Sequence, residues 1–177
     1  MLVNLSYHNT DLKINLPDGL ATVIKPLSTP RLPDQINAVR ESIRNPIGSP
    51  TLRNLVASTD RVAIAISPTN PAVVISTVLP TVLRELAHVP TNRINIILTA
   101  HERDQHTHSN LVDMSEYRKM NYVVINHDHT RDSYLVHMGC TKNGTQIWIN
   151  RFWIESDVRI TLGVIDHDLT SGFIGGP

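Results

Sequence analysis

The first residues alternate apolar and polar side chains, a pattern that predicts a small β-hairpin. Residues 2–8 (LVNLSYH) and 11–16 (DLKINL) alternate in this way around a short polar turn, as strands with one covered face do. Residues 21–27 (ATVIKPL) predict a third short extended segment, and a stretch rich in proline and polar residues follows it. We therefore expect a β-rich N-terminal appendage over residues 1–30 and a second domain over residues 31–177.

The pattern then changes to apolar strands separated by helices. Residues 61–67 (RVAIAIS) are nearly all apolar, which is typical of a strand buried on both faces. Further strands are predicted over residues 94–100, 122–127 and 158–165, with helices around them near residues 36–43, 51–58, 74–86, 111–120 and 151–157. Alternation of this kind predicts an α/β fold, a Rossmann-like, mostly parallel sheet with helices on both faces.

Two local signals add detail to this fold. One apolar stripe is expected along the helix near residue 80, formed by Val74, Val78, Val82 and Leu86. Pro80 within it predicts a kink, because proline removes a helical hydrogen bond. A hairpin over residues 133–150 is predicted by its Asn143-Gly144 turn. In that hairpin we expect His137 to pack or face the sheet edge, and Cys140 to be a small buried residue rather than a nucleophile.

Composition and charge exclude several classes of protein. Lysine plus arginine and aspartate plus glutamate number 16 each, so the net charge is zero, and no basic stripe indicates a nucleic-acid partner. The apolar runs are far shorter than the roughly 20 residues that a membrane helix needs, and the N-terminus lacks the apolar core of a signal peptide. A single cysteine cannot form an internal disulfide, which favours a reducing, cytoplasmic setting.

Polar or unusual residues follow three of the predicted strands. In open α/β sheets, ligands bind outside the carboxyl ends of the strands. One such segment begins with Ser67, one contains His101, and one carries Asp168 before a glycine-rich stretch. If their strands are parallel neighbours, the three segments converge, and we expect them to open onto one shared pocket.

A cluster of histidines follows the strand at residues 94–100, formed by His101, His106 and His108. His101 stands where the loop begins, and an imidazole with a pKa of about 6.5 can accept and return a proton at working pH. A solvated loop histidine is the alternative. The H-x4-H-x-H spacing also suits zinc or nickel, although no cysteine or firmly placed carboxylate joins it. A histidine-rich metal binder is therefore a further hypothesis, and we assign no metal ligand.

The C-terminal segment carries a group of acidic residues, a histidine and glycines, namely Asp166, His167, Asp168, Gly172, Gly175 and Gly176. Carboxylates flanking a histidine suit acid–base chemistry, and glycines let backbone N–H groups approach an anionic ligand closely. A polar strand end followed by a flexible terminus is the alternative. Residues 126–132 (NHDHTRD) form another polar cluster, for which we expect a turn that closes the strand, with Asp128 or Asp132 capping the next element.

Six segments of the chain form a recognisable series. They are residues 45–56 (NPIGSPTLRNLV), 61–71 (RVAIAISPTNP), 97–103 (ILTAHER), 122–151 (YVVINHDHTRDSYLVHMGCTKNGTQIWINR), 155–165 (ESDVRITLGVI) and 171–177 (SGFIGGP). The block at 122–151 is the most specific, because NHD followed by LVxxGxTxxGTxIxIN is long and unusual. In this order, the segments resemble the N-terminal domain of the nickel-dependent lactate racemase family.

The resemblance implies a two-domain isomerase whose active site lies between the domains. It implies a nickel-pincer nucleotide, a pyridinium-derived mononucleotide that carries nickel and accepts a hydride, and a small 2-hydroxy acid as substrate. Two histidines of the family act as acid–base partners on the two faces of that acid. His101 matches the first of them, so His106 and His108 are interpreted as bystanders.

The nucleotide-binding loop departs from the family's pattern. The family reads Ser-Asp-x-Thr-Arg-Pro there, whereas this chain reads SPTNP. Pro68 and Asn70 thus stand near an Asp and an Arg, whose carboxylate and guanidinium are the strongest hydrogen-bonding groups of the loop. The residues that the resemblance still implies for cofactor binding are Ser67, Thr69, Asn70, Gly172, Gly175 and Gly176.

The second family histidine, in a Gly-x-Ile-Glu-Pro-His context, aligns with Asp168, and His167 stands one place before it. A one-residue shift would restore a histidine, but the period of two along a strand would then aim it elsewhere. Either two-sided histidine catalysis is absent, or Asp168 replaces one partner. An aspartate, with an ordinary pKa of about 3.9, is a poor acid at neutral pH unless burial raises that value.

The family also places a cofactor-carrying lysine shortly after the Gly-Gly motif and a nickel-ligating histidine further on, whereas this sequence ends at Pro177. We therefore expect that the chain alone does not hold the cofactor and is inactive without a C-terminal domain or partner subunit. A domain that kept the fold, lost the chemistry and serves as a binding module or scaffold is the alternative.

Overall fold

The computed structural model divides into two compact units, Met1–Pro33 and Asp34–Pro177. The residues that it describes are 1–7, 10–17, 19, 22, 30–66, 74–99, 113–168 and 170–175. Apart from Thr22, the extended segment expected over residues 21–27 lies outside this described part of the chain.

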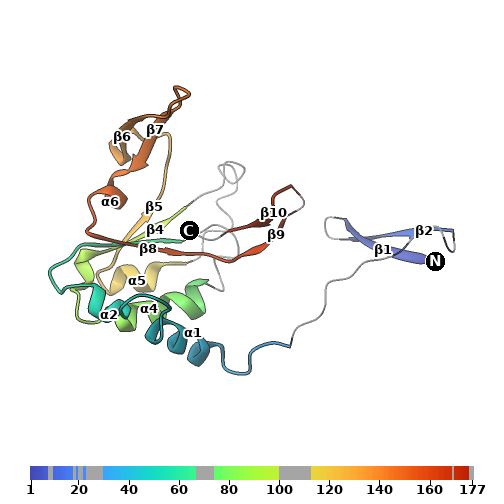
Figure 1. Ribbon diagram of the computed structural model, residues 1–177, viewed down its shortest axis with the longest axis horizontal. Helices are drawn as coiled ribbons and strands as arrows, with labels where there is room; N and C mark the ends of the chain where they lie inside the picture. The colour runs from blue at the N-terminus through green and yellow to red at the C-terminus, as the bar shows by residue number, and fades with distance from the viewer. Residues whose placement is uncertain are drawn as a thin grey trace. The chain divides into compact units, whose positions relative to one another are not determined.

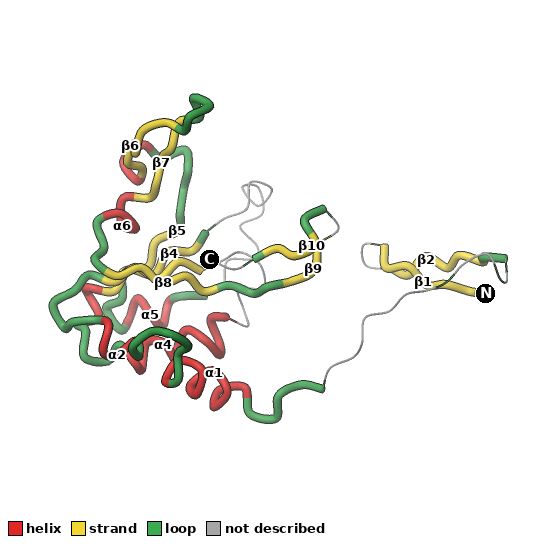
Figure 2. The backbone as a smooth tube through the Cα atoms, in the orientation of Figure 1, coloured by secondary structure: helices red, strands yellow, loops and turns green. Residues whose placement is uncertain are grey.

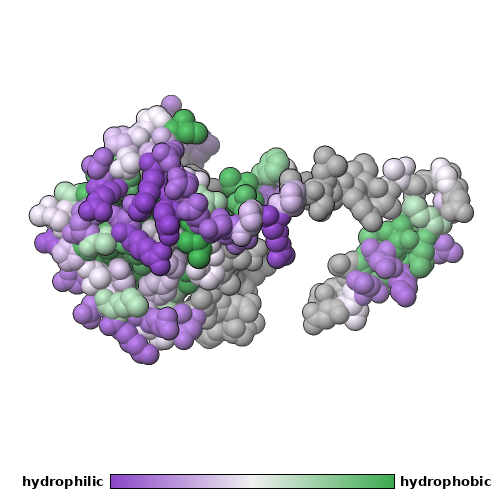
Figure 3. Space-filling view, turned by 90° about the horizontal axis from the view of Figure 1, so that it is seen from below, coloured by the Kyte–Doolittle hydropathy of each residue, from purple (hydrophilic) through white to green (hydrophobic). Residues whose placement is uncertain are grey.

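The N-terminal unit contains the predicted hairpin, whose strands are β1 (Leu2–Tyr7) and β2 (Thr10–Asn15). The strands pair antiparallel, with Val3 opposite Ile14 and Leu5 opposite Leu12 (Figure 1). Because side chains alternate between the two faces of a strand, these four apolar residues share one face. Hydrophobic side chains accordingly gather on the surface of this unit (Figure 3).

The second unit is built on the parallel sheet that the strand pattern predicted. Its strands are β3 (Val62–Ile66), β4 (Ile94–Leu98), β5 (Val123–Asn126) and β8 (Val158–Leu162). Their order across the sheet is β5-β4-β3-β8, and each neighbouring pair is parallel (Figure 1). The predicted α/β fold class is confirmed.

Helices cover both faces of this sheet (Figure 2). On one face lie α1 (Gln35–Arg44), α2 (Leu52–Leu55), the π-helical turn η1 (Val74–Val78), α4 (Leu79–Glu85) and α5 (Ser115–Lys119). On the other lie α6 (Arg151–Ile154) and the 3₁₀ turn η5 (Asp132–Tyr134), while the 3₁₀ turn η2 (Thr91–Arg93) leads into β4. The layer that contains α1, α2 and α4 presents a largely hydrophilic surface on the side away from the sheet (Figure 3). In the described residues, every helix is too short or too polar to cross a membrane.

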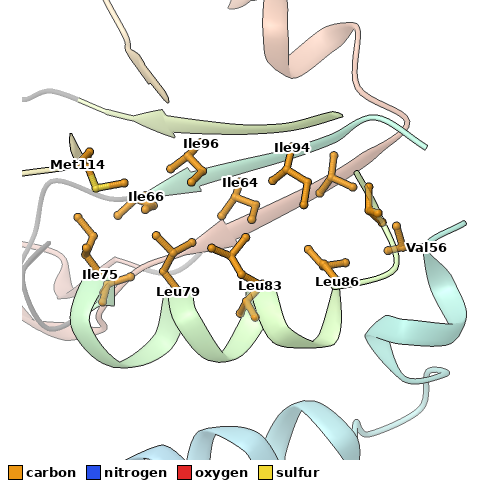
Figure 4. Close-up of a cluster of buried hydrophobic side chains, with 14 residues drawn as sticks. Val56, Ile64, Ile66, Ile75, Leu79, Leu83, Leu86, Ile94, Ile96 and Met114 are labelled. Atoms are coloured by element: carbon orange, nitrogen blue, oxygen red, sulfur yellow. The ribbon is translucent and has the colours of Figure 1, made fainter. Parts of the chain in front are cut away.

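Two apolar clusters hold the layers together. The larger cluster packs α4 against β3 and β4 (Figure 4), and its buried members include Val62, Ile64, Ile66, Leu79, Leu83, Leu86, Ile94 and Ile96. The smaller cluster, on the opposite face, consists of Ala63, Ile97 and Ile125, with Tyr134, Phe152 and Trp153 packed against it. Successive residues of β3 therefore enter opposite clusters, which explains why this strand is almost entirely apolar.

Pro80 lies where the helix changes type. The π-helical turn η1 ends at Val78 and α4 begins at Leu79, so Pro80 stands in the first turn of α4. In that turn its missing N–H removes no α-helical hydrogen bond. The irregularity expected at Pro80 therefore takes the form of a switch from π-helical to α-helical geometry.

The second unit also has two antiparallel hairpins. The first, β6 (Leu135–Cys140) with β7 (Gln146–Asn150), was predicted from its Asn-Gly turn and is confirmed, with Gly144 at a φ of +83°. The second, β9 (Asp166–Asp168) with β10 (Gly172–Ile174), was not predicted. Its strands are three residues long, too short for an alternating pattern to be read from the sequence.

The prediction that Cys140 is buried was wrong, because this residue is exposed. The hairpin of β6 and β7 extends away from the parallel sheet (Figure 1), and its outer face also exposes Met138 and Trp148. The ring of His137 lies 4.7 Å from that of Trp148, measured between centroids, on this same exposed hairpin. The apolar character of the neighbours predicted burial, but only the inner side of the hairpin is covered.

Candidate functional site

The carboxyl ends of three parallel strands meet at one edge of the sheet. Ile66, the last residue of β3, lies opposite Leu98 of β4 and Leu162 of β8. Thr99 ties the first two strand ends together, because its backbone N–H and its hydroxyl both donate to the Ile66 carbonyl, at 3.1 and 2.8 Å. The strands lie side by side and parallel, as predicted, whereas the shared pocket stays a prediction because the segments after β3 and β4 lie largely outside the described residues.

Several of the predicted site residues lie outside the described residues, namely Ser67, Thr69, Asn70, His101, His106, His108 and Gly176. Their roles stay predictions. The described part of the tail contains His167, Asp168, Gly172 and Gly175, all in or beside the hairpin of β9 and β10.

Asp168 closes the turn between β9 and β10. Its Oδ2 accepts hydrogen bonds from the backbone N–H groups of Thr170 and Ser171, at 3.0 and 2.7 Å. It also accepts from the Ser171 hydroxyl at 2.7 Å and from the Thr170 hydroxyl. These hydrogen bonds, led by the one from the Thr170 hydroxyl, hold the pKa of Asp168 well below its ordinary value. The side chain is therefore a carboxylate at neutral pH, which suits an acceptor and not a proton donor.

His167 is an exposed neighbour of that turn. Its ring lies 5.2 Å from the ring of Phe173, measured between centroids, in the cross-strand pair that joins β9 to β10. Its backbone N–H donates to Oδ1 of Asp166 at 2.8 Å. The imidazole is thus held at the surface by ring contact, beside the ionised Asp168.

The glycine at position 175 is required by the fold itself. Gly175 has a φ of +91°, and a Cβ atom there would lie 1.9 Å from the carbonyl oxygen of Val164. The backbone after β10 therefore presses against the segment that leaves β8. Gly172, at a φ of +81°, has open space around its Cα and serves the turn through its backbone conformation.

His127 is a candidate that the sequence analysis missed. It directly follows β5, and its backbone N–H donates to the Leu98 carbonyl at 2.8 Å, which extends the pairing of β4 with β5 by one residue. Because side chains alternate, His127 shares a face with Ile125, the face that α6 covers. Nδ1 of its ring lies 3.0 Å from Nδ2 of Asn150.

Asn150 determines which nitrogen of His127 carries the proton. Its Oδ1 accepts the Phe152 N–H at 3.0 Å and so caps the N-terminus of α6. The amide oxygen is therefore committed to the cap, and the amide nitrogen must donate to Nδ1 of His127. This network assigns the proton of a neutral His127 to Nε2. Burial, assisted by the charge of His129, lowers the pKa of His127 and so favours that neutral form.

The polar cluster after β5 also contains the turn that was expected there. Oδ1 of Asp128 accepts from the Thr130 N–H at 2.9 Å and from the Thr130 hydroxyl at 2.6 Å. These bonds lower the pKa of Asp128. The predicted polar turn after β5 is confirmed, whereas the expected cap is not, because Arg131 precedes η5 and its side chain does not cap it. Counting by two from Ile125 would have placed His127 on the α6 face, but its partner Asn150 lies 23 residues further along the chain.

We expect the free energy of unfolding to decrease below about pH 6.5, in part through His127. Its folded pKa lies below the unfolded value of 6.5, so the unfolded chain takes up the proton first. The stability linked to this histidine is fully present above that pH and is lost as the pH falls through the folded pKa. Urea unfolding of the wild type and of His127→Asn, which cannot titrate there, should show the smaller loss for the variant. An equal loss in both proteins would contradict this prediction.

Parallel strands that end side by side define an open α/β sheet, the class of fold in which ligands bind outside the carboxyl ends of the strands. The profile of the lactate racemase N-terminal domain family matches residues 7–177, and the chain belongs to this family.

Individual relatives agree with this assignment. The chain is 32% identical over 140 residues to the lactate racemase of Lactiplantibacillus plantarum, an alignment that covers 78% of this chain and 33% of that protein. The fold is similar to that of the lactate racemase apoprotein from Thermoanaerobacterium thermosaccharolyticum, with a TM-score of 0.69 and 21% identity. That match covers 99% of this chain and 42% of the other. The matches therefore span about a third of one relative and about two fifths of the other.

Proposed function

We propose that this chain acts as the N-terminal catalytic domain of a lactate racemase-like isomerase that works on a 2-hydroxy acid. Membership of the lactate racemase N-terminal domain family over residues 7–177 is the observation that carries the proposal. Because the chain spans 33% of the related lactate racemase, the activity is assigned to this domain together with a C-terminal domain or partner subunit.

His101 is the residue to which we assign proton transfer. It comes two residues after Thr99, whose hydrogen bonds to Ile66 mark the edge where β3 and β4 end. In the proposed reaction His101 takes up the hydroxyl proton of the acid and returns it, a role that suits an imidazole near neutral pH. The hydride that leaves C2 and returns to its other face would need an acceptor, which is the chemistry that the family's cofactor would supply. Asp168 contributes a fixed negative charge, and the exposed imidazole of His167 lies beside it in the sequence.

The residues that the structure describes do not form a metal-binding group for the nickel-pincer nucleotide of the family. Among the described residues, no group of three or more His, Cys, Asp or Glu side chains is placed to hold a metal ion. The positive φ of Gly175 is explained by its contact with Val164 and needs no ligand. We therefore derive no step through this cofactor, and the proposal concerns proton handling by the chain's own residues.

The test is interconversion of enantiomers by the protein as isolated from its source cells, grown with nickel. L-lactate, D-lactate and longer 2-hydroxy acids are each supplied as one enantiomer, and the products are separated by chiral chromatography. Appearance of the opposite enantiomer for at least one acid supports the proposal. Absence of interconversion across the whole panel would overturn it.

A second candidate is a binding or scaffold domain that kept the fold and lost the chemistry. It is favoured by Asp168, whose carboxylate occupies the position of a family histidine and is bound by four donors within its own turn. This candidate predicts that the protein binds L-lactate without interconverting it, so an equilibrium binding measurement beside the assay distinguishes the two.

A further inference from the structure

His127 and Asn150 form a polar pair in a largely apolar setting. The face of the sheet on which they lie is otherwise covered by a cluster of Ala63, Ile97, Ile125, Tyr134, Phe152 and Trp153. Asn150 is 8% exposed, and burial of an amide is costly unless its hydrogen bonds are replaced. Both ends of the Asn150 amide are satisfied, one by the Phe152 N–H and one by Nδ1 of His127.

Capping of α6 alone does not account for Asn150. Aspartate, serine or threonine would accept the Phe152 N–H equally well. Of the common capping residues, asparagine is the one that accepts through its oxygen and also donates through an amide nitrogen. The choice of residue therefore serves the ring of His127 as well as the helix.

The pair leaves a defined hydrogen-bond donor on the far side of the ring. With Nδ1 accepting from Asn150, the proton of the neutral imidazole is on Nε2. In the described part of the chain, the bond from Asn150 is the one hydrogen bond that the structure shows for this ring. His127 is only partly buried, so Nε2 can meet a ligand.

The donor stands beside the proposed site. Leu98 of β4 lies opposite Asn126 of β5, so the next position in each strand brings Thr99 next to His127. Thr99 is in turn bonded to the end of β3 and precedes His101 by two residues. His127 thus lies at the edge of the sheet where β4 ends, and β4 is the strand that precedes His101 in the sequence.

We propose that His127 orients the substrate, donating a hydrogen bond from Nε2 to an oxygen of the 2-hydroxy acid, and that Asn150 is the positioning residue that holds its ring. The identity of the ligand rests on the proposed function. A neutral donor of fixed tautomer can hold the acid without competing for the proton that His101 transfers.

The first test is nuclear magnetic resonance of the protein with ¹⁵N-labelled histidine. Long-range ¹H–¹⁵N spectra should show His127 as the Nε2–H tautomer, and added L-lactate should shift Nε2 more than Nδ1. A predominant Nδ1–H tautomer, or a His127 signal that saturating L-lactate leaves unchanged, would overturn the inference.

The second test compares two replacements that each keep one side of the imidazole. In the His127→Gln variant, the amide nitrogen lies near the position of Nε2 and can still donate to the substrate. In the His127→Asn variant, the shorter side chain reaches Asn150 but not the substrate. Because a hydrogen bond to a charged ligand contributes substantially to affinity, His127→Asn should weaken L-lactate binding roughly 10- to 100-fold. His127→Gln should keep the wild-type affinity within about threefold. His88→Asn is the matched control, because His88 is also a partly buried histidine bonded to protein, through the Val56 carbonyl at 2.7 Å.

The result with lactate separates this inference from the proposed function. If the assay shows enantiomer interconversion but His127→Asn binds lactate as tightly as the wild type, the inference alone fails. If no acid is interconverted while lactate shifts Nε2 of His127 and the Asn variant loses affinity, the proposed function fails and the binding contact stands. Equal loss of affinity in the His127→Asn and His88→Asn variants would indicate a structural effect and overturn the inference.

Discussion

Replacing His101 by alanine will lower the rate of enantiomer interconversion by about 10²- to 10⁴-fold, the range typical of a lost general acid–base residue. The expected reason is the loss of the imidazole that, by the proposed function, takes up the hydroxyl proton. Folding should be preserved, because the carboxyl end of β4 is tied to β3 by Thr99 and to β5 by the His127 N–H. Rates measured by chiral chromatography, with circular dichroism as the check on folding, decide the outcome.

His106→Ala and His108→Ala are the matched controls, since they remove imidazoles from the same segment. If His101 acts in proton transfer, these two variants should retain the wild-type rate. If the three histidines form a metal site, all three variants should lose bound metal and activity together. Metal content measured beside the rates therefore distinguishes proton transfer at one residue from metal binding by the cluster.

The strands and layers of the fold could be predicted from patterns of residues that are close in sequence. The nearly apolar run at residues 62–66 predicted a strand covered on both faces, and the structure buries its alternate residues in two separate clusters. The Asn-Gly turn at residues 143–144 was equally informative, because a tight hairpin needs a residue such as glycine at a positive φ. Each of these signals depends on residues close in sequence.

The polar contacts of the site depend on residues far apart in sequence. Asn150 and His127 are 23 positions apart, and nothing in either local sequence indicates that one fixes the tautomer of the other. The hydrogen-bond donors of Asp168, Thr170 and Ser171, are in contrast close to it in sequence. They can bond to Asp168 only because the chain turns between β9 and β10, and these strands of three residues are too short to be predicted. Exposure of Cys140 likewise reflects where a hairpin projects, which local hydrophobicity does not encode.

The ionisable side chains of Asp168, Asp128 and His127 differ in the charge state that their surroundings favour. Hydrogen bonds lower the pKa of Asp168 and Asp128 and so keep them ionised, whereas burial, assisted by the charge of His129, lowers the pKa of His127 and favours its neutral form. Groups whose charge is fixed in this way can hold and orient a ligand but do not exchange protons near neutral pH. The proton-transfer role of His101 rests instead on the resemblance to the lactate racemase family, and these groups with a fixed charge state do not compete for it.

Leu79→Ala should destabilise the second unit by about 2 to 5 kcal/mol, the usual cost of removing a buried leucine side chain. Leu79 is fully buried, and its side chain lies between α4 and the sheet, next to Ile64 of β3 (Figure 4). Because native domains are stable by only about 5 to 15 kcal/mol, this single change removes a large share of the total. Urea unfolding should show a lower midpoint with an unchanged slope.

Ile47→Ala is the matched control, because Ile47 is 100% exposed and its truncation should alter the free energy of unfolding by no more than about 0.5 kcal/mol. A similar small effect for Leu79→Ala would mean that α4 does not pack on β3 as described. The consequence reaches the site, since β3 and β4 end at the edge where His101 and His127 follow. A loosened α4 should therefore weaken L-lactate binding in proportion to the fraction of unfolded protein, whereas His101→Ala should reduce turnover in a fully folded protein.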